Sequence, residues 1–373
     1  MDNKTTKRYF VTGGGTGGHI YPALAVINEL RANGIEDIFY VGNPKNQECE
    51  LAKENNIKFL PVNVNGMPRK MSLKSLFWAI KLVFAILKCL IYVRKYKPDV
   101  VFATGGYVSA PLLFAAKFKN IPYFLHDADA QIGVVTRCFS SGAIVLSTPF
   151  ESVKKSLQNV NVQVTGNPIR NEFSTLSKEQ ARLNLGIEDN LTILVMGGSQ
   201  GARSINNAIV PIAKKLIEEF NVCIIHQSGK KRYDEVLALL NEHFPAYKEN
   251  KNYRLLPYID DMPSILKSSD IAIARSGSLS LSEIQASKVA SILIPYPYSA
   301  GGHQQKNAQE LVEQGSAEMI IDFELTPELL YKKLSELLNN KDKLIQMQNK
   351  AIEYSKPNAV KQITKNILDF LNE

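Results

Sequence analysis

The sequence predicts an α/β protein with two doubly wound domains, each built around a parallel β-sheet. Short runs rich in Val, Ile and Phe alternate with helical stretches along the whole chain, and several of these runs are almost continuously apolar. Strands of a parallel sheet that helices cover on both faces have this character. A length of 373 residues is sufficient for two domains, and a glycine-rich loop follows a predicted strand in each half.

The predicted strands fall into two groups with a break between them. They comprise residues 9–12, 38–41, 100–103, 123–126, 143–146 and 162–165, and then 192–196, 222–227, 254–256, 271–274 and 291–294. Gly166-Asn167-Pro168 is a turn signature after the last strand of the first group, and Lys356-Pro357 interrupts a long helical stretch. We therefore expect one domain to comprise residues 1–166 with 357–373, and the other to comprise 167–356.

Cysteine usage and the N-terminal residues indicate a cytoplasmic protein. The four cysteines are widely separated and include no C-x-x-C pair, which excludes a disulfide framework and a structural zinc site. The chain reaches a glycine loop before any apolar run long enough for a signal peptide. We expect the protein to be made in the cytoplasm and to stay there.

The positive charge of the chain is concentrated in its first half. Residues 1–165 contain 20 Lys and Arg against 11 Asp and Glu, whereas residues 166–373 contain 24 against 25. A basic half suggests an anionic partner, such as a phosphorylated substrate, an acidic lipid surface or nucleic acid. We expect no nucleic-acid partner, because no zinc-finger spacing, RNP-like motif or basic recognition helix accompanies the charge.

Much of the excess charge lies in residues 67–97, which contain eight Lys and Arg and no acid. From residue 76 to 93, 16 of 18 residues are apolar, and Lys74, Lys81, Lys88 and Lys95 recur every seven residues. A transmembrane helix would bury Lys81 and Lys88 at about 2.5–3.5 kcal/mol each, which disfavours it. A crossover helix of the domain and an interfacial helix on an anionic membrane remain, and we favour one helix that serves as both.

A glycine loop, Gly13–Gly18, follows the first predicted strand and precedes a helix. Its G-x-G-x-x-G spacing exposes backbone N–H groups that bind diphosphate oxygens. An NAD site is disfavoured because the second strand ends in residues 41–43 (Val-Gly-Asn), without the acid that binds the ribose. A role in a tight turn alone is also disfavoured. Diphosphate binding is the favoured interpretation of this loop.

Two further features of the first half lie at strand ends. His19, next to the glycine loop, is either a general base or a cap of the loop backbone. A second glycine loop, Thr104–Tyr107, follows another predicted strand and offers a second set of backbone N–H groups. Two such loops in a basic domain suggest a substrate that carries a diphosphate.

In the second half, two segments carry candidate nucleotide ligands. Gly197–Arg203 (GGSQGAR) offers a phosphate-binding loop in which Ser199 donates a hydrogen bond. Glu283 lies one turn into a helix that follows a predicted strand. There it either accepts hydrogen bonds from a ribose diol or is an acid that the helix dipole favours, and the spacing alone does not separate these alternatives.

A third segment of the second half is rich in amides. Gln304, Gln305 and Asn307 follow a proline-rich loop and are suited to sugar hydroxyls, although alone they indicate only a polar loop. No Asp-x-Asp follows a strand, so the sequence offers no evident ligand pair for a divalent metal.

The segments GGGTGGHIYPALAV, ATGGYVSAPLLFAAK, GNPIR, GGSQGARSIN, HQSGK, YIDDM and SGSLSLSEI with GGHQQKNA occur in one order over nearly the whole chain. This set resembles the MurG family, bacterial enzymes that transfer GlcNAc from UDP-GlcNAc to undecaprenyl-pyrophosphoryl-MurNAc-pentapeptide (lipid I) and so form lipid II for peptidoglycan. The resemblance implies a GT-B fold, in which two Rossmann-like domains face a cleft, and hexosyltransferase activity without a cofactor.

The resemblance also implies how the donor, UDP-GlcNAc, is bound. The 197–201 loop would hold the diphosphate, the Ile259 backbone would read uracil and Glu283 would bind the ribose. Arg170 would reach the donor from the linker, and the paired glutamines would hold GlcNAc. The implied donor residues are Thr16, Gly17, Gly18, Asp129, Arg170, Ser199, Ile259, Ser278, Leu279, Ser280, Leu281, Ser282, Glu283, Gln304 and Gln305.

For the acceptor, lipid I, the resemblance implies a peripheral enzyme on the cytoplasmic face of the plasma membrane. It would contact anionic lipid through residues 67–97, with other membrane cell-wall synthesis proteins as possible partners. In the implied inverting reaction His19 is the base for the MurNAc 4-hydroxyl, and the helix start after Gly198, with Arg170, stabilises the departing UDP without a metal. The implied diphosphate ligands of the acceptor are Gly14, Gly15, Thr104, Gly105, Gly106 and Tyr107.

The chain departs from the family pattern at two places. Where the family usually has His-Glu-Gln-Asn, this chain has residues 126–129 (His-Asp-Ala-Asp), so Asp129 replaces an amide expected to contact GlcNAc. Residues 301–303 (Gly-Gly-His) replace a charged run before the paired glutamines. The alternatives are another GT-B transferase that moves a UDP-sugar to a membrane lipid such as diacylglycerol, and a catalytically silent UDP-sugar-binding protein.

Overall fold

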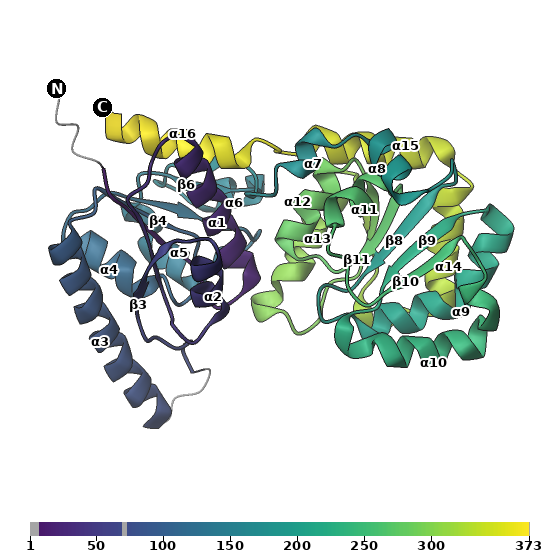
Figure 1. Cartoon of the computed structure of the whole chain (residues 1–373), viewed down its shortest axis with the longest axis horizontal. Helices are drawn as coiled ribbons and strands as arrows, with labels where there is room; N and C mark the ends of the chain where they lie inside the picture. Colours follow the sequence, from purple (N-terminus) through teal and green to yellow (C-terminus); the bar gives the residue numbers. More distant parts are fainter. Residues whose placement is uncertain (1–6, 69–72, 373) are drawn as a thin grey trace. The chain divides into compact units, whose positions relative to one another are not determined.

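The computed structural model describes residues 7–68 and 73–372, and the chain divides into two compact units (Figure 1). Unit 1 comprises the described part of residues 1–169 and 358–373, and unit 2 comprises residues 170–357. Each unit contains its own parallel sheet and its own apolar core.

In unit 1 the described strands form a seven-stranded parallel sheet in the order β3-β2-β1-β4-β5-β6-β7. The central strands β1, β4 and β5 are buried along their whole length, which explains their nearly unbroken apolar sequence. The strands are β1 (Tyr9–Thr12), β2 (Ile38–Gly42), β3 (Lys58–Pro61), β4 (Val100–Ala103), β5 (Tyr123–His126), β6 (Leu146–Thr148) and β7 (Val162–Val164).

The last helix of the chain, α16, completes unit 1. It packs on α1, buries Ile363 and Ile367 in the core of unit 1, and places the ring of Phe370 5.7 Å from the ring of Phe124. The described helices of unit 1 are α1 (Gly17–Ala32), α2 (Gln47–Glu54), α3 (Leu73–Tyr96), α4 (Ala110–Phe118), α5 (Val134–Phe139), η1 (Ser140–Gly142), α6 (Glu151–Ser156) and α16 (Ala359–Asn372).

Helix α3 has one buried and one exposed apolar face. Ala85, Cys89 and Val93 are at most 4% exposed, and the helix packs against α4. Among the described residues α3 is the one helix long and apolar enough to cross a membrane, over Ser75–Tyr96, and 17% of that window is buried. Three- and four-residue spacing collects large exposed side chains on one face: Leu76, Phe77, Ile80, Val83, Phe84, Leu87 and Ile91.

Unit 2 repeats the same strand order with six parallel strands, β10-β9-β8-β11-β12-β13. Its helices start and end at residues suited to those positions: the Ser177 side chain accepts from the Gln180 N–H, and Gly186 ends the same helix in a left-handed conformation. The strands are β8 (Thr192–Met196), β9 (Cys223–Gln227), β10 (Tyr253–Leu256), β11 (Ile271–Ala274), β12 (Ala290–Leu293) and β13 (Ala317–Met319).

The helices of unit 2 cover the faces of this sheet. They are α7 (Glu172–Thr175), α8 (Lys178–Leu185), α9 (Arg203–Phe220), η2 (Lys230–Arg232), α10 (Tyr233–His243), η3 (Pro245–Lys248), α11 (Met262–Ser268), α12 (Ser278–Ala286), η4 (Ala300–Gly302), α13 (His303–Glu313), η5 (Asp322–Glu324), α14 (Pro327–Leu338) and α15 (Lys341–Tyr354).

Each sheet reverses its strand order at one point. In unit 1 this point lies between β1 and β4, and in unit 2 between β8 and β11. The loops after two such strands diverge to opposite sides of the sheet and leave a crevice at its carboxyl edge, where doubly wound proteins bind ligands. The predicted glycine loops at residues 13–18, 104–107 and 197–201 follow β1, β4 and β8, and residues 275–277 (Arg-Ser-Gly) follow β11.

Three strands differ from the sequence prediction by more than one residue at an end. Strand β6 comprises Leu146–Thr148 and not residues 143–146, because its pairing with β7 continues through the buried polar residues Ser147 and Thr148. Strands β3 and β13 were not predicted. Both lie at sheet edges, where Lys58 is exposed and Glu318 forms ion pairs with two lysines, so neither has the apolar run of a central strand.

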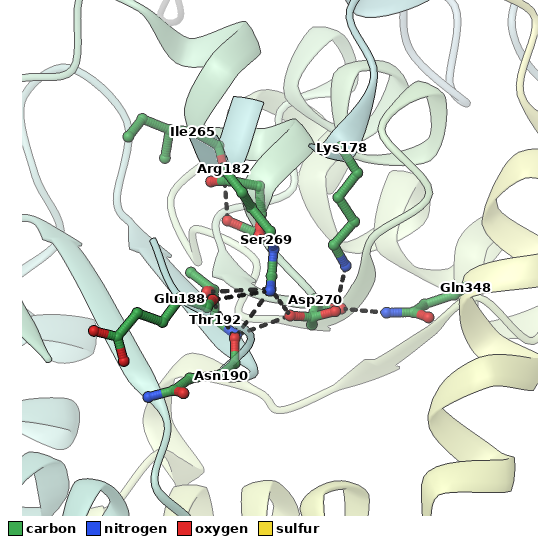
Figure 2. Close-up of polar contacts among 10 residues, drawn as sticks. Lys178, Arg182, Glu188, Asn190, Thr192, Ile265, Ser269, Asp270 and Gln348 are labelled. Atoms are coloured by element: carbon green, nitrogen blue, oxygen red, sulfur yellow. Dashed lines mark hydrogen bonds and ion pairs between the residues drawn. The ribbon is translucent and has the colours of Figure 1, made fainter. Parts of the chain in front are cut away.

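A buried carboxylate, Asp270, joins the start of β11 to three other elements of unit 2 (Figure 2). Its carboxylate pairs with Lys178 and, at 2.8 Å, with Arg182, and it accepts the backbone N–H of Thr192 at 2.8 Å. Its backbone carbonyl accepts from Gln348 Nε2 at 3.2 Å. Because this carboxylate is only 7% exposed, its charge depends on these partners for compensation.

We predict that Asp270→Ala destabilises unit 2 by about 3–5 kcal/mol, because the Arg182 guanidinium keeps its burial and loses its partner charge. Urea denaturation followed by circular dichroism measures this loss. As a control, Lys251→Ala removes an exposed ion pair with Glu188 and should leave the unfolding midpoint unchanged. An equal effect of the two variants would contradict the role of the buried carboxylate.

Candidate functional site

In unit 1 the loops after β1 and β4 are joined by His19. Its Nδ1 lies 2.8 Å from the Thr104 carbonyl oxygen, and the Thr104 hydroxyl donates to the His19 carbonyl at 2.6 Å. A carbonyl can only accept, so Nδ1 carries the proton and Nε2 of the neutral ring has a free lone pair. His19 is half-buried in the first turn of α1, which suits it to take a proton from a substrate hydroxyl.

The glycines of these two loops allow the loops to touch. A Cβ on Gly106 would collide with the Gly14 carbonyl oxygen, and Gly15, Gly105 and Gly106 all have positive φ. The Tyr107 ring covers Gly15, where a Cβ would lie 2.8 Å from a ring carbon. The predicted acceptor residues Gly14, Gly15 and Thr104–Tyr107 are therefore brought together at one edge of the sheet.

A buried carboxyl group, which was not predicted from the sequence, lies beside the first loop. Glu48 is fully buried, and a Cβ on Gly14 would lie 2.6 Å from its Oε1. The same oxygen accepts from the Asn43 N–H at 3.2 Å and from Asn46 Nδ2 at 3.1 Å. These two donors hold the Glu48 carboxyl group directly beside the backbone of Gly14.

The segment after β5 contains the residues in which the chain departs from the family pattern. Burial lowers the pKa of His126 to about 4, so the ring is neutral and donates from Nε2 to Asn167 Oδ1 at 3.1 Å. Burial raises the pKa of Asp127, which accepts the backbone N–H of Gly133 at 2.9 Å and of Asp129 at 3.3 Å. Asp127 thus fixes the loop that presents Asp129, which is only partly buried.

In unit 2 a cavity of about 820 Å³ lies at the carboxyl ends of β8 and β11. Its floor is glycine: a side chain at Gly198 or Gly277 would meet nothing within 4 Å. Its lining includes three cations, Arg203, Lys231 and Arg232, called the cationic wall below, and two aromatic rings, Tyr296 and Tyr298, called the tyrosine wall. The remaining lining residues are Met196, Gly197, Gln200, Gly201, Ala202, Ser204, Asn207, Arg275, Ser280, Pro297, Gln304 and Asp322.

The cavity has more positive than negative charge. Glu235 forms ion pairs with both Arg203, at 2.9 Å, and Arg232, at 3.0 Å, so a single acid serves two cations. Arg275 pairs with Asp322 and donates to Ser204 Oγ at 3.0 Å. A ligand with a diphosphate fits this balance, with backbone N–H groups of the 197–201 loop as further donors.

Glu283 lies in the second turn of α12 and faces Arg170. The guanidinium Nη2 is 4.0 Å from the Glu283 carboxylate, and the same guanidinium covers the ring of Phe173 at 5.3 Å. Burial raises the pKa of Glu283 to about 7, against the opposing effect of Arg170. The Glu283 side chain is 20% exposed, and with a pKa of about 7 its carboxyl group is about half ionised at neutral pH.

Other predicted donor residues occupy varied environments. Ser199 is exposed, whereas Leu281 is only 1% exposed, so the Leu281 side chain belongs to the core. The Ile259 N–H donates to Gln227 Oε1 at 2.9 Å, which leaves its carbonyl as the group available to a base. Gln304 Oε1 accepts from the backbone N–H groups of Ser276 and Tyr296, while Gln305 is exposed.

The remaining members of the α12 start are Ser278, Leu279, Ser280 and Ser282. Ser278 is the first residue of the helix after Gly277, and Ser280 lines the cavity. In unit 1, Gly17 and Gly18 open α1 directly after Thr16, which is exposed. Within the described ranges no group of three His, Cys, Asp or Glu side chains lies close enough to hold a metal ion.

The cationic and aromatic residues that line the cavity were not predicted as ligands from the sequence. Lys231 and Arg232 directly follow the HQSGK segment after β9, and Arg203 closes the GGSQGAR loop. Their positions after the carboxyl ends of parallel strands were the available signal. The tyrosines lie in the Pro-Tyr-Pro-Tyr segment after β12, a pattern that also occurs in ordinary loops.

Comparison with known proteins gives full-length matches. The glycosyltransferase family 28 N-terminal domain matches residues 9–144, and the family 28 C-terminal domain matches residues 192–363. A UDP-N-acetylglucosamine–N-acetylmuramyl-(pentapeptide) pyrophosphoryl-undecaprenol N-acetylglucosamine transferase from Thermoanaerobacter sp. (strain X514) is 38% identical over 361 residues, 96% of this chain and 98% of the relative.

Two further matches agree. The transferase of the same name from Desulfitobacterium hafniense (strain Y51) is 37% identical over 97% of this chain and 99% of its own length. The crystal structure of Acinetobacter baumannii MurG superposes with a TM-score of 0.80 at 29% identity, covering 97% of this chain and 99% of that one. The chain therefore belongs to the MurG family of UDP-N-acetylglucosamine–N-acetylmuramyl-(pentapeptide) pyrophosphoryl-undecaprenol N-acetylglucosamine transferases.

Proposed function

We propose that the chain transfers GlcNAc from UDP-GlcNAc to the MurNAc 4-hydroxyl of undecaprenyl-pyrophosphoryl-MurNAc-pentapeptide, with inversion, and so forms lipid II for peptidoglycan. The observation that carries this proposal is the identity of 36–38% over nearly the full length with relatives that bear this name. A cationic cavity with a glycine floor, at the strand-order reversal of unit 2, supports a nucleotide-sugar substrate.

Unit 2 would bind the donor. The 197–201 loop with Ser199 and the start of α12 would hold the diphosphate, and the cationic wall of the cavity would balance its charge. Glu283 would accept the ribose hydroxyls, and Arg170, 4.0 Å away, would favour the charged carboxylate. On departure of UDP, Arg170 and the helix start after Gly198, together with the cationic wall, would stabilise the developing negative charge.

Unit 1 would bind the acceptor and activate it. The glycine loops after β1 and β4, with Gly14, Gly15 and residues 104–107, would contact its diphosphate, and His19 would act as the general base. With the His19 Nδ1–H fixed by the Thr104 carbonyl, Nε2 accepts the proton of the attacking hydroxyl. The hydroxyl oxygen then attacks the anomeric carbon of GlcNAc as the bond to UDP breaks.

Unit 1 would also attach the enzyme to the cytoplasmic face of the plasma membrane. The exposed apolar stripe of α3 would enter the headgroup layer, and lysines of the same helix, such as Lys81, which is exposed, would meet anionic lipid. A polyprenyl-linked acceptor stays in the bilayer, so an enzyme that uses it needs such a surface. Other cell-wall synthesis proteins of the membrane are proposed partners.

The proposed activity is tested by incubating the full-length protein with UDP-GlcNAc and a lipid I analogue, and following UDP release. We expect release with this acceptor and none with diacylglycerol. Turnover with diacylglycerol alone would support the related lipid glycosyltransferase instead. Absence of turnover with both lipids, while UDP-GlcNAc still binds, would indicate a UDP-sugar-binding protein without catalysis.

We predict that His19→Ala lowers kcat by about 10²–10⁴-fold, the usual contribution of a positioned general base, with little change in the KM for UDP-GlcNAc. Steady-state kinetics with saturating lipid I analogue measure both constants. His243→Ala, at the end of α10 in unit 2, is the matched control and should retain full activity. Unchanged turnover in the His19 variant would exclude it as the base.

We predict that donor binding strengthens as pH rises through about 7, because Glu283 must lose its proton to accept both ribose hydroxyls. The KM for UDP-GlcNAc should fall about 5- to 10-fold between pH 6 and 8, in proportion to the ionised fraction. Glu283→Gln should bind more weakly and remove this dependence. Persistence of the same pH profile in the Gln variant would assign it to another group.

We predict that replacing Phe77 and Phe84 by Ser weakens binding to vesicles that contain phosphatidylglycerol by at least about tenfold. Both rings are about two-thirds exposed on α3, at 65% and 67%, so their loss leaves the core of unit 1 intact. Vesicle co-sedimentation measures the effect. Phe323→Ser, equally exposed in unit 2, is the control, and equal loss in both variants would refute attachment through α3.

A further inference from the structure

An aromatic ladder lines one side of the cavity in unit 2. The ring of Tyr298 meets the ring of Tyr296 edge-on at 5.7 Å, and Phe323 meets Tyr298 edge-on at 6.3 Å. Both tyrosines line the cavity, and Tyr298 is 71% exposed. Because its neighbours support it on two sides, the Tyr298 ring is held in place while most of its surface is open to a ligand.

The loop that carries this ladder is tied to an amide of the paired glutamines. Gln304 Oε1 accepts from the backbone N–H of Tyr296 at 2.9 Å and of Ser276 at 3.3 Å. The same contact therefore joins the tyrosine segment to the start of α12, beside Gly277 on the cavity floor. Gln304 therefore fixes the backbone of the segment that carries the two tyrosines.

The chemistry of this wall matches a sugar ring better than a phosphate. No charged residue occurs from Pro295 to Gly302, and the nearby cation Arg275 is neutralised by Asp322 and lies over the Tyr296 ring at 5.6 Å. The unmatched positive charge lies instead on the wall with Arg203 and Arg232. A pyranose has an apolar C–H face and polar edges, which an aromatic ring beside amides can contact together.

The nucleotide end of the donor lies elsewhere under the proposed function. Glu283 and Ile259, the residues proposed for ribose and uracil, are not among the described residues that line the cavity. Under that proposal the loop of residues 197–201 holds the diphosphate, which joins the nucleoside to the sugar.

We infer that Tyr298, supported by Tyr296 and Phe323, is a specificity-determining residue that packs on the hexosamine ring of the donor. This inference rests on the proposed function, which assigns a UDP-sugar to this cavity. The ring selects the sugar, whereas the nucleotide is held by other groups.

The test is calorimetric binding to the full-length protein, with UDP-GlcNAc and UDP compared as ligands. The Tyr298→Ala variant loses one aromatic packing contact. It should therefore bind UDP-GlcNAc about 3- to 10-fold more weakly than the wild type and bind UDP equally well. Tyr298→Phe keeps the ring and should bind both ligands as the wild type does. Tyr354→Ala, on α15 and 41% exposed, is the control for loss of an exposed tyrosine.

Unchanged UDP-GlcNAc binding by Tyr298→Ala would overturn the inference, and so would an equal loss for UDP, since the ring would then contact the nucleotide. Circular dichroism of each variant verifies that it is folded. Because binding is measured without the acceptor, the result stands apart from the transfer assay. A wild-type protein that binds UDP-GlcNAc but transfers nothing to lipid I refutes the proposed function and leaves this test valid.

Discussion

The reversal of strand order in each parallel sheet is the constraint on which the rest of the structure depends. A right-handed crossover sends the helix after β1 to one face of the sheet and the helix after β4 to the other, so the two loops part and expose backbone N–H groups at one edge. Unit 2 repeats this arrangement with β8 and β11. In both units of this GT-B protein, glycines at the reversal let the loops approach each other or a ligand, as Gly106 does against Gly14.

The parts of the fold that could be predicted from sequence are those where burial alone decides the residue type. Strands β1, β4, β5, β8 and β11 lie at or next to the centre of a sheet, and their predicted bounds agree with the structure. The edge strands β3 and β13 contain Lys58 and Glu318, whose charges are tolerated because one side of the strand meets solvent or lysine partners. Their stability comes from pairing with a neighbour distant in sequence, which a local apolar pattern does not record.

The residues of the candidate site also divide into those that could be predicted from the sequence and those that could not. Glycine loops are visible in sequence because a backbone conformation requires the residue type, so the three at residues 13–18, 104–107 and 197–201 could be assigned to the sheet edges where they lie. The carboxylate of Glu48 beside Gly14 could not, because nothing in the segment around residue 48 shows that a loop 34 positions earlier will cover it. The cationic wall of unit 2 was hidden for a related reason: Arg203 and Arg232 meet only through Glu235, on a different helix from Arg203.

The charged residues of this chain therefore have two different roles, one in each unit, and the net charge of the sequence does not distinguish them. The excess in unit 1 lies largely on an exposed helix, where lysines in solvent suit a diffuse anionic surface and are weakened by salt. Unit 2 is nearly neutral in composition, yet its cavity is cationic. Glu235, the acid that pairs with Arg203, is not among the described residues that line the cavity. Of the described lining cations, Arg275 is the one that pairs with an acid of the lining, Asp322. Arg203 and Arg232 are 63% and 32% exposed, but they lie in one cavity and can form direct, charge-assisted hydrogen bonds with one bound diphosphate. The near-neutral half of the sequence is thus the half whose geometry is better suited to a charged nucleotide.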